Sequence, residues 1–541
     1  MRGADVLVRS LVNAGVRHVF TLSGNHIMSV FDAALDAGLN LVHTRHEAAA
    51  VHMADAWARL MGEPGIALVT AGPGHANALS ALHTAQMAES PVVLLSGHAA
   101  HDEQGRGAFQ EMRQAEMAAP VTKASWTCAN AADVAADLAR AVRIARSGRP
   151  GPVHLSLPTE ALESEVDSSA THDVAAFTPE SITIANGDTV TLLAALRRAK
   201  RPLILAGPAS CTRAGGRRLA ALEAAAGIPC LGMESPRGIN DPCLGAFADI
   251  LVEADCILLL GKRLDFTLAF GRAPAIDANC VFLQIDPERF ELDRTGRAVA
   301  GRLGARAVAD VAAAIDALTV LARYSGPIHE AWQDKVRAAI AYRPAAWDRV
   351  HATERGKLHP VEACRPLQRL LDSHPDSVFV CDGGEFGQWA QACLSAQNRV
   401  INGAAGAIGS ALPFALAARL AQPAAPVVVL MGDGTFGFHM AEIDTAVRCA
   451  LPFVAVVGND ARWNAEYQIQ LRRFGPGRLI GCELRPLRYD EVTQALGGHG
   501  EHVTDAGELL AAAERAQGSG LPAVLDVAIE GVAAPVVRRS G

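Results

Sequence analysis

The sequence lacks the marks of a secreted or membrane protein. No run of about 18 apolar residues occurs, so no transmembrane helix is expected. Residues 1–15 read as an amphipathic helix with interspersed charges, which is unlike the uninterrupted apolar core of a signal peptide. The eleven cysteines are scattered and include no C-x-x-C pair, so neither a disulfide framework nor a zinc site is expected. These absences predict a cytoplasmic protein that does not associate with membranes.

An excess of positive charge is also absent. Lys and Arg number 49 against 57 Asp and Glu, which gives a net charge of −8 and a pI near 6.1. This balance argues against nucleic acid or an anionic membrane as the main partner. Half of the residues are apolar and a fifth are charged, so the 541-residue chain can bury a large core over roughly three or four domains. We expect a folded protein whose partners are small molecules.

Short apolar runs alternate with helical patterns, which predicts an α/β protein with three doubly wound, mostly parallel sheets. A polar stretch over 163–188 is expected to be a linker, and a charged helical connector is expected over 330–355. The expected strands are 16–22, 39–44, 66–70, 92–96 and 153–157 in the first block, 202–206, 256–260 and 281–285 in the second, and 377–381, 427–431, 453–457 and 523–527 in the third.

The stretch 427–460 indicates the chemistry. An apolar run meets Gly432-Asp433-Gly434, a helical segment over 440–450 follows, and a second apolar run ends at Asn459-Asp460. This order is typical of a βαβ unit. Because parallel strands joined by a right-handed crossover lie close together, Asp433 and Asp460 can point into one crevice at the edge of the sheet. Two carboxylates at such an edge suit Mg²⁺.

The same glycines allow a function of another class. Residues 432–437 also match the G-x-G-x-x-G fingerprint of a nucleotide-binding oxidoreductase or of a noncatalytic nucleotide-binding protein. However, Asp433 would push a carboxylate toward a bare dinucleotide pyrophosphate, whereas a diphosphate that carries its own cation would accept it. A glycine-rich turn with two surface acids is the alternative without function.

The GDG turn, the helix and the strand that ends in Asn459-Asp460 resemble the diphosphate and metal motif of thiamine diphosphate (ThDP) enzymes. The group includes acetolactate synthases, benzaldehyde lyases, 2-hydroxyacyl-CoA lyases and oxalyl-CoA decarboxylases. The family pattern ends in Asn-Asn, and Asp460 replaces the second Asn with an equally hard oxygen that adds a negative charge. The resemblance implies Asp433, Asp460 and the backbone carbonyl of Arg462 as ligands of Mg²⁺.

The resemblance covers nearly the whole chain. It implies a pyrimidine-binding domain over 1–165, a middle domain over 188–325 and a diphosphate-binding domain over 356–535. Residues 261–271, GKRLDFTLAFG, resemble the middle domains of both acyl-CoA lyases and acetolactate synthases, and they leave open whether this domain binds FAD, a nucleotide or nothing.

In the first block, Glu47 stands in RHEAAA between a strand and a helix. Taken alone, it is an acid favoured at a helix start. The resemblance makes it the essential glutamate that hydrogen-bonds the aminopyrimidine ring of ThDP and assists removal of the C2 proton. The loop TAGPGHAN over 70–77 resembles the T-x-G-P-G loop that contacts the partner subunit's cofactor, which implies Gly72, Pro73 and Asn77 as cofactor contacts.

Two further residues of this block are candidates for substrate contacts. Gln110 is either part of an ordinary polar loop or, by resemblance, a polar group that faces the substrate. His26 is either a structural histidine or the proton relay that benzaldehyde lyases carry at this position.

The third block supplies the remaining cofactor contacts. Ile408 is either a core residue or the bulky apolar side chain beneath the bent cofactor, and Trp463 either lines the pocket or packs in the core. The contacts that the resemblance implies are Gly383, Gly384, Glu385, Phe386, Gly406, Ala407, Ile408, Gly432, Asp433, Gly434, Thr435, Asp460 and Trp463.

The implied activity is that of a ThDP- and Mg²⁺-dependent C–C lyase or carboligase that acts on 2-oxo acids or 2-hydroxy ketones, as acetolactate synthases and benzaldehyde lyases do. A 2-hydroxyacyl-CoA lyase or an oxalyl-CoA decarboxylase, with an acyl-CoA substrate, is the alternative. Glu47 and Asp433 belong to domains that in the family meet around the cofactor only across a subunit interface. A homodimer or homotetramer is therefore implied.

Overall fold

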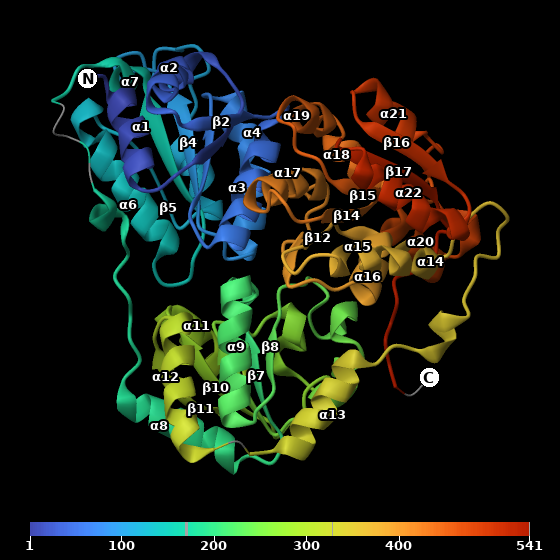
Figure 1. Cartoon of the computed structure of the whole chain (residues 1–541). Coiled ribbons are helices and arrows are strands. Elements are labelled where there is room, and N and C mark those ends of the chain that lie inside the picture. The colour runs from blue at the N-terminus through green and yellow to red at the C-terminus, as the bar shows by residue number, and fades with distance from the viewer. Residues whose placement is uncertain (168–170, 172, 327, 540–541) are drawn as a thin grey trace. The chain divides into compact units, whose positions relative to one another are not determined.

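The computed structural model describes residues 1–167, 171, 173–326 and 328–539. The chain forms two compact units. The first comprises 1–180, 412–423 and 439–451, and the second comprises 181–411, 424–438 and 452–541. The first unit contains one parallel sheet and the second contains two (Figure 1), so the predicted α/β class with three parallel sheets is confirmed. No helix among the described residues is both long enough and apolar enough to cross a bilayer.

The first sheet has the strand order β2-β1-β3-β4-β6-β5, and all neighbouring strands are parallel. Its interior strands β3 and β4 are buried along their whole length, as expected for a parallel sheet covered on both faces. The strands are β1 His18–Thr21, β2 Asn40–His43, β3 Gly65–Val69, β4 Val92–His98, β5 Ala124–Thr127 and β6 Val153–Pro158. The helices are α1 Gly3–Asn13, α2 Met28–Ala37, α3 Glu47–Met61, α4 Pro73–Met87, α5 Gln114–Ala118, α6 Val134–Arg146 and α7 Thr159–Glu163.

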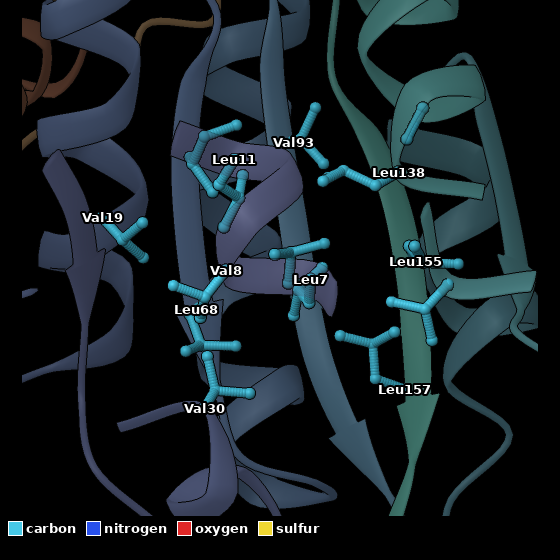
Figure 2. Packing of buried hydrophobic residues seen from close by; sticks show 14 of the residues in the cluster. Leu7, Val8, Leu11, Val19, Val30, Leu68, Val93, Leu138, Leu155 and Leu157 are labelled. Atoms are coloured by element: carbon cyan, nitrogen blue, oxygen red, sulfur yellow. The ribbon is translucent and has the colours of Figure 1, made fainter. Parts of the chain in front are cut away.

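The core of the first sheet lies beneath α1. Leu7, Val8 and Leu11 of this helix belong to one cluster of buried side chains with Leu68 and Leu155 of the strands (Figure 2). Each of these side chains is at most 1% exposed. Burial of apolar surface stabilises the fold by roughly 25 cal/mol per Å². This packing fixes the strand ends from which the candidate site residues of this sheet project.

The second sheet has the order β11-β10-β9-β7-β8 and is also parallel. The strands are β7 Pro202–Ala206, β8 Cys230–Gly232, β9 Cys256–Leu260, β10 Val281–Asp286 and β11 Leu303–Val308. The helices are α8 Asn186–Arg198, α9 Arg213–Ala226, α10 Phe247–Leu251, α11 Arg289–Ala298, α12 Val311–Ser325 and α13 Glu330–Ala341.

The third sheet has the order β13-β12-β14-β15-β17-β16, which repeats the order of the first sheet when the strands of each are counted along the chain. The strands are β12 Val378–Cys381, β13 Asn398–Ile401, β14 Val427–Gly432, β15 Val454–Asn459, β16 His499–Val503 and β17 Ala523–Ala528. The helices of this part of the chain are α14 Pro360–Cys364, α15 Gln368–Asp372, α16 Gly384–Cys393, α17 Ala411–Ala421, α18 Asp433–His439, α19 Glu442–Arg448, α20 Asn464–Phe474, α21 Tyr489–Ala495 and α22 Ala506–Gly518.

One helix is not expected from the sequence. The helix expected over 440–450 corresponds to α19, and a further helix, α18, begins at Asp433 itself, directly after β14. Acidic residues in the first turn favour a helix start because the positive end of the helix dipole lies there. Asp433 occupies that place in α18, and Glu442 and Asp444 occupy it in α19. The acidic side chains therefore mark two helix starts where the apolar pattern indicated one.

Replacement of Leu155 by Ala should destabilise the first sheet. The side chain is fully buried on β6, so the cavity left behind should cost about 2–5 kcal/mol. We expect the melting transition of the first unit to move to lower temperature in a calorimetric scan. Leu35→Ala on α2, where the side chain is 82% exposed, is the matched control. Equal melting profiles for the two variants would contradict the placement of Leu155 in the core.

Candidate active site

A cavity of about 180 Å³ lies at the carboxyl ends of β12, β14 and β15 in the third sheet. β12 and β14 are neighbours whose following strands, β13 and β15, lie on opposite sides of them. The cavity is therefore at a topological switch point, which is where open α/β sheets bind ligands. It is lined by Gly383, Gly384, Glu385, Phe386, Gly406, Ile408, Gly432, Asp433, Gly434, Thr435, Gly458, Asp460, Arg462, Trp463, Asn464, Ala465 and Glu466.

Three helices begin at this cavity. The first residues of α16, α18 and α20 are Gly384, Asp433 and Asn464, and all three line the cavity wall. The first backbone N–H groups of a helix have no partner within the helix and lie at the positive end of its dipole. Three such ends around one cavity form a site that attracts an anion.

Close packing requires glycine at two positions of the cavity wall. A Cβ on Gly434 would lie 2.6 Å from the ring of Trp463. A Cβ on Gly383 would lie 2.8 Å from Nδ2 of Asn402 and 3.0 Å from Cγ2 of Ile408. The indole ring of Trp463 and the side chain of Ile408 are therefore held against the two glycine-rich turns.

Asp433, which is buried, and Asp460, which is half-buried, line the same cavity. Burial, and then repulsion by Asp460, raises the pKa of Asp433 to about 7, and burial raises the pKa of Asp460 to about 6. Asp433 is 1% exposed, and its Oδ2 atom has no hydrogen-bond partner among the described residues. An unpartnered buried carboxylate oxygen beside a second carboxylate requires a proton or a cation. Because both ligand atoms are hard oxygens, the pair fits Mg²⁺.

Asp382 joins the two glycine-rich loops beside these acids. Its fully buried carboxylate accepts the backbone N–H groups of Gly383 at 2.7 Å, Gly409 at 3.1 Å and Ala411 at 3.0 Å. Burial raises the pKa of this carboxyl to about 6 although the N–H groups oppose the shift. The sequence analysis did not single out Asp382. A lone Asp after a strand gives no signal of the loops it will hold.

Most cofactor contacts expected in the third block lie together in this cavity. Ala407 is not part of the cavity wall, and its carbonyl accepts a hydrogen bond from Asn402 Nδ2 at 2.9 Å. Glu385 lines the cavity, but its carboxylate accepts hydrogen bonds from Arg237 Nη2 at 3.1 Å and from Ala534 N–H at 3.0 Å. The structure therefore ties Glu385 to the protein. A contact between its carboxylate and a cofactor would compete with these two bonds.

In the first unit, Glu47 begins α3 and is 8% exposed. Asn77 on α4 donates from Nδ2 to Glu47 Oε2 at 3.0 Å. A Cβ on Gly74 would lie 3.4 Å from Glu47 Oε1, so the first turn of α4 packs against the carboxylate. His46 caps α3, since its Nδ1 accepts the N–H of Ala48 at 3.1 Å. Glu47 is thus held at a fixed place by the loop expected to contact the cofactor.

The loop that begins α4 adopts a conformation that favours glycine. Gly72 has φ +57°, and a Cβ there would lie 2.7 Å from the carbonyl oxygen of Gln110. Gln110 itself has φ +58°, and its buried Oε1 has no partner among the described residues. Strained backbone and an unpaired buried polar atom are features of ligand contacts.

A residue that the sequence analysis missed fixes this loop. Gln114 is 1% exposed and accepts the N–H of Gly72 at 2.9 Å through Oε1. Its Nε2 donates to the carbonyl of Gly97 at 3.1 Å and to Ser156 Oγ at 3.0 Å. The side chain therefore ties the Gly72 loop to strands β4 and β6.

His26 follows β1 and packs against β4. A Cβ on Gly97 would lie 2.6 Å from Cβ of His26, so the missing side chain at position 97 makes room for the histidine. Nδ1 of His26 lies 3.3 Å from Thr70 Oγ1, and its ring stacks on Phe109 at 5.9 Å. Burial lowers the pKa of His26, which favours the neutral ring. The imidazole of His26 therefore contacts Phe109, the residue that precedes Gln110.

Asp490, His502 and Asp526 form a second acidic group, on α21, β16 and β17. Their ligand atoms lie within 4.8 Å of one another, so the group could hold a metal ion. Both carboxylates already have partners: Arg488 binds Asp490 at 2.6 Å and 2.8 Å, and His502 Nδ1 lies 3.0 Å from Asp526. Asn459 Nδ2 also donates to Asp526 at 3.0 Å. The group therefore holds Asn459, the residue before Asp460.

Two family models match the chain. A thiamine pyrophosphate enzyme, N-terminal TPP binding domain, matches residues 1–117, and a thiamine pyrophosphate enzyme, C-terminal TPP binding domain, matches residues 382–527. The matched ranges contain the groups around Glu47 and around Asp433. A dinucleotide-binding oxidoreductase is thus not supported.

Relatives match over nearly the whole length. The chain is 34% identical over 538 residues to a probable acetolactate synthase of Mycobacterium bovis and to the acetolactate synthase large subunit IlvG of Mycobacterium tuberculosis, covering 97% of this chain and 95% of each relative. It is 31% identical over 556 residues to 2-hydroxyacyl-CoA lyase 2 of Danio rerio, covering 92% of this chain and 86% of that protein. The chain belongs to the thiamine diphosphate enzyme family, and its two TPP-binding domains imply ThDP as cofactor.

Replacement of Asp460 by Asn should stabilise the metal-free protein at pH 8. The folded-state pKa values of about 7 and about 6 lie above the usual carboxyl value, so these groups destabilise the fold as the pH rises through 6 and 7. Replacing Asp460 by the neutral Asn removes the repulsion that acts on the Asp433 carboxylate. We expect the chelator-treated variant to melt at least about 2 °C higher than wild type at pH 8, with a smaller gain at pH 5.

The control for this measurement is Asp334→Asn, whose side chain is 77% exposed on α13. We expect its melting temperature to equal that of the wild type at both pH values. A lower melting temperature for Asp460→Asn at pH 8 would contradict the repulsion between the carboxylates of Asp433 and Asp460.

Proposed function

We propose that this protein is a ThDP- and Mg²⁺-dependent C–C lyase or carboligase that acts on 2-oxo acids or 2-hydroxy ketones. The observation that supports it most is the unpartnered Asp433 Oδ2 in the same cavity as the half-buried Asp460, where three helices begin. A diphosphate with a divalent cation satisfies both features, because the cation neutralises the acids and the helix N-termini bind the anion. The relatives named acetolactate synthase agree with this class of activity.

In this proposal, Asp433, Asp460 and the backbone carbonyl of Arg462 hold Mg²⁺. The N–H groups at the starts of α16 and α18 bind the diphosphate, and Ile408 supports the cofactor from below. When bound, ThDP supplies a C2 nucleophile and an electron sink for cleavage or formation of a bond next to a carbonyl. Trp463, held against Gly434, excludes water from one side of the cavity.

A second copy of the chain completes the site in this proposal, as a homodimer or homotetramer in the cytoplasm. Glu47, oriented by Asn77, accepts a hydrogen bond from the aminopyrimidine ring, and Gly72 and Pro73 contact the same ring. His26 and Gln110 face the substrate. The neutral ring of His26 can accept or donate a proton at the substrate oxygen.

A 2-hydroxyacyl-CoA lyase is the second candidate. Four cations act on acids of the cavity wall: Arg237 and Arg472 lower the pKa of Glu385, and Arg462 and Lys357 lower that of Asp460, each against the larger effect of burial. Arg462 lines the cavity, and its positive charge can attract an anionic substrate, either a 2-oxo acid or the phosphates of coenzyme A. The resemblance to 2-hydroxyacyl-CoA lyase 2 of Danio rerio is the reason to include the thioester.

One experiment separates the two candidates. The purified chain, loaded with ThDP and Mg²⁺, is incubated with pyruvate, with benzoin, with a panel of 2-hydroxyacyl-CoA thioesters and, separately, with oxalyl-CoA. Mass spectrometry then identifies the products. Acetolactate or benzaldehyde supports the first candidate, an aldehyde with formyl-CoA from a 2-hydroxyacyl-CoA supports the second, and formyl-CoA with CO₂ from oxalyl-CoA indicates a decarboxylase. Absence of any product would overturn the proposal of a lyase or carboligase.

Glu47→Gln should keep ThDP binding and lose proton transfer. A neutral amide cannot exchange a proton with the aminopyrimidine ring, so C2 proton exchange of bound ThDP should slow by about 100-fold or more. Exchange into D₂O, followed by NMR after acid quench, measures the rate. An unchanged rate would remove Glu47 from this role.

FAD or a nucleotide in the middle domain stays a prediction. The switch point of the second sheet lies between β7 and β9, where Gly261 follows β9 with φ +60°. The visible absorption spectrum of the purified protein tests for flavin.

A further inference from the structure

Glu442 is a buried acid to which the sequence assigns no role. It begins α19, is 1% exposed and lies within the first compact unit. Its carboxylate accepts the backbone N–H of Arg45 at 3.0 Å through Oε1 and at 3.2 Å through Oε2. It also accepts the hydroxyl of Thr445 at 2.7 Å. Burial of a carboxylate is costly, so these bonds must offset the loss of hydration.

The backbone that Glu442 holds leads directly into Glu47. Arg45 and His46 connect β2 to α3, and the N–H groups of both interact with the Glu442 carboxylate. Without an acceptor oxygen at this place, the N–H of Arg45 would have to find another partner or stay unpaired. His46 is the cap of the helix that begins with Glu47. Glu442 therefore fixes the last two residues before the acid at the helix start.

Further contacts from α19 hold the same junction. Arg448 Nη2 donates to the carbonyl of His43 at 2.8 Å, and Arg45 Nη1 lies 3.5 Å from Asp444. Thr44 Oγ1 donates to the carbonyl of Thr21 at 3.1 Å, which ties the junction to β1. The contacts of Arg448 and Arg45 lie nearer the surface, whereas Glu442 and Thr44 are buried. The junction is thus held from β1 on one side and from α19 on the other.

We propose that Glu442 is the positioning residue for Glu47: by bonding the backbone of Arg45 and His46, it sets the place from which the Glu47 carboxylate reaches the aminopyrimidine ring. The inference rests on the proposed function, because it needs Glu47 to act on the cofactor. A displacement of about 1 Å at a reacting group can cost about 100-fold in rate. The contribution of Glu442 is therefore to rate and not to affinity.

The test compares Glu442→Ala with Glu442→Gln in the full-length holoenzyme with ThDP and Mg²⁺. The alanine variant loses both acceptor oxygens, so C2 proton exchange of bound ThDP and kcat should fall together by about 100-fold, with KM and ThDP affinity nearly unchanged. The glutamine variant keeps one oxygen for the N–H of Arg45 and an amide N–H that the Thr445 hydroxyl can accept. It should recover most of both rates.

Asp55→Asn is the matched control for loss of stability alone. Asp55 lies on α3 itself, is fully buried and accepts Arg59 Nε at 2.8 Å. This variant should lower the melting temperature and leave the exchange rate of bound ThDP unchanged. A slowed exchange in Asp55→Asn, equal to that in Glu442→Ala, would show that the effect is loss of stability and would overturn the positioning role.

The two proposals fail in different ways. If Glu47→Gln leaves C2 exchange unchanged, the proposed function of Glu47 is wrong. If Glu47→Gln slows exchange while Glu442→Ala does not, the function of Glu47 stands and the positioning role of Glu442 is overturned. A loss of ThDP affinity in Glu442→Ala with a normal exchange rate at saturation would also overturn it.

Discussion

The repulsion between two carboxylates, the buried Asp433 and the half-buried Asp460, constrains the C-terminal TPP-binding domain of this protein. Each carries a raised pKa, and one oxygen of Asp433 has no partner among the described residues. Removal of a charge from water costs several kcal/mol unless a counter-charge is present. The fold therefore holds a destabilising pair at the end of β14 and β15, and a divalent cation bound between them would remove this cost. The helix N-termini at the same cavity would bind an anion that accompanies the cation.

The interior of each sheet could be predicted from the sequence, and most of the edges could not. The expected strands at 202–206 and 256–260 coincide with β7 and β9, which are continuous apolar runs buried on both faces. The strands without a prediction are edge strands: β5, β8, β11, β13 and β16. β11 reads LGARAV and β16 reads HGEHV, and both are partly exposed. An edge strand needs fewer apolar residues, so its sequence resembles a loop.

The candidate site divides in a similar way. Asp433 and the glycines around it could be predicted because their signal is local: an acid and glycines directly after an apolar run. Asp382, Gln114 and Glu442 could not be predicted, because each acts through partners far along the chain. Glu442 and Arg45 are 397 residues apart in the sequence. The sequence around a single polar residue looks the same whether that residue lies on the surface or is buried and holds the backbone of a site.

The first and third sheets share one strand order, which is the pattern expected if both descend from one ancestral domain. Equivalent loops, those after the first four strands of each sheet, carry the candidate site residues of both sheets. In the first sheet these residues are His26, Glu47, Gly72 and Gln110, and in the third they are Gly383, Ile408, Asp433 and Asp460. Duplication of one ancestral domain, followed by divergence of its loops, would leave this pattern. In the proposed site, one descendant would supply acid and amide groups and the other the metal ligands, so neither copy alone would retain a complete set of reactive groups.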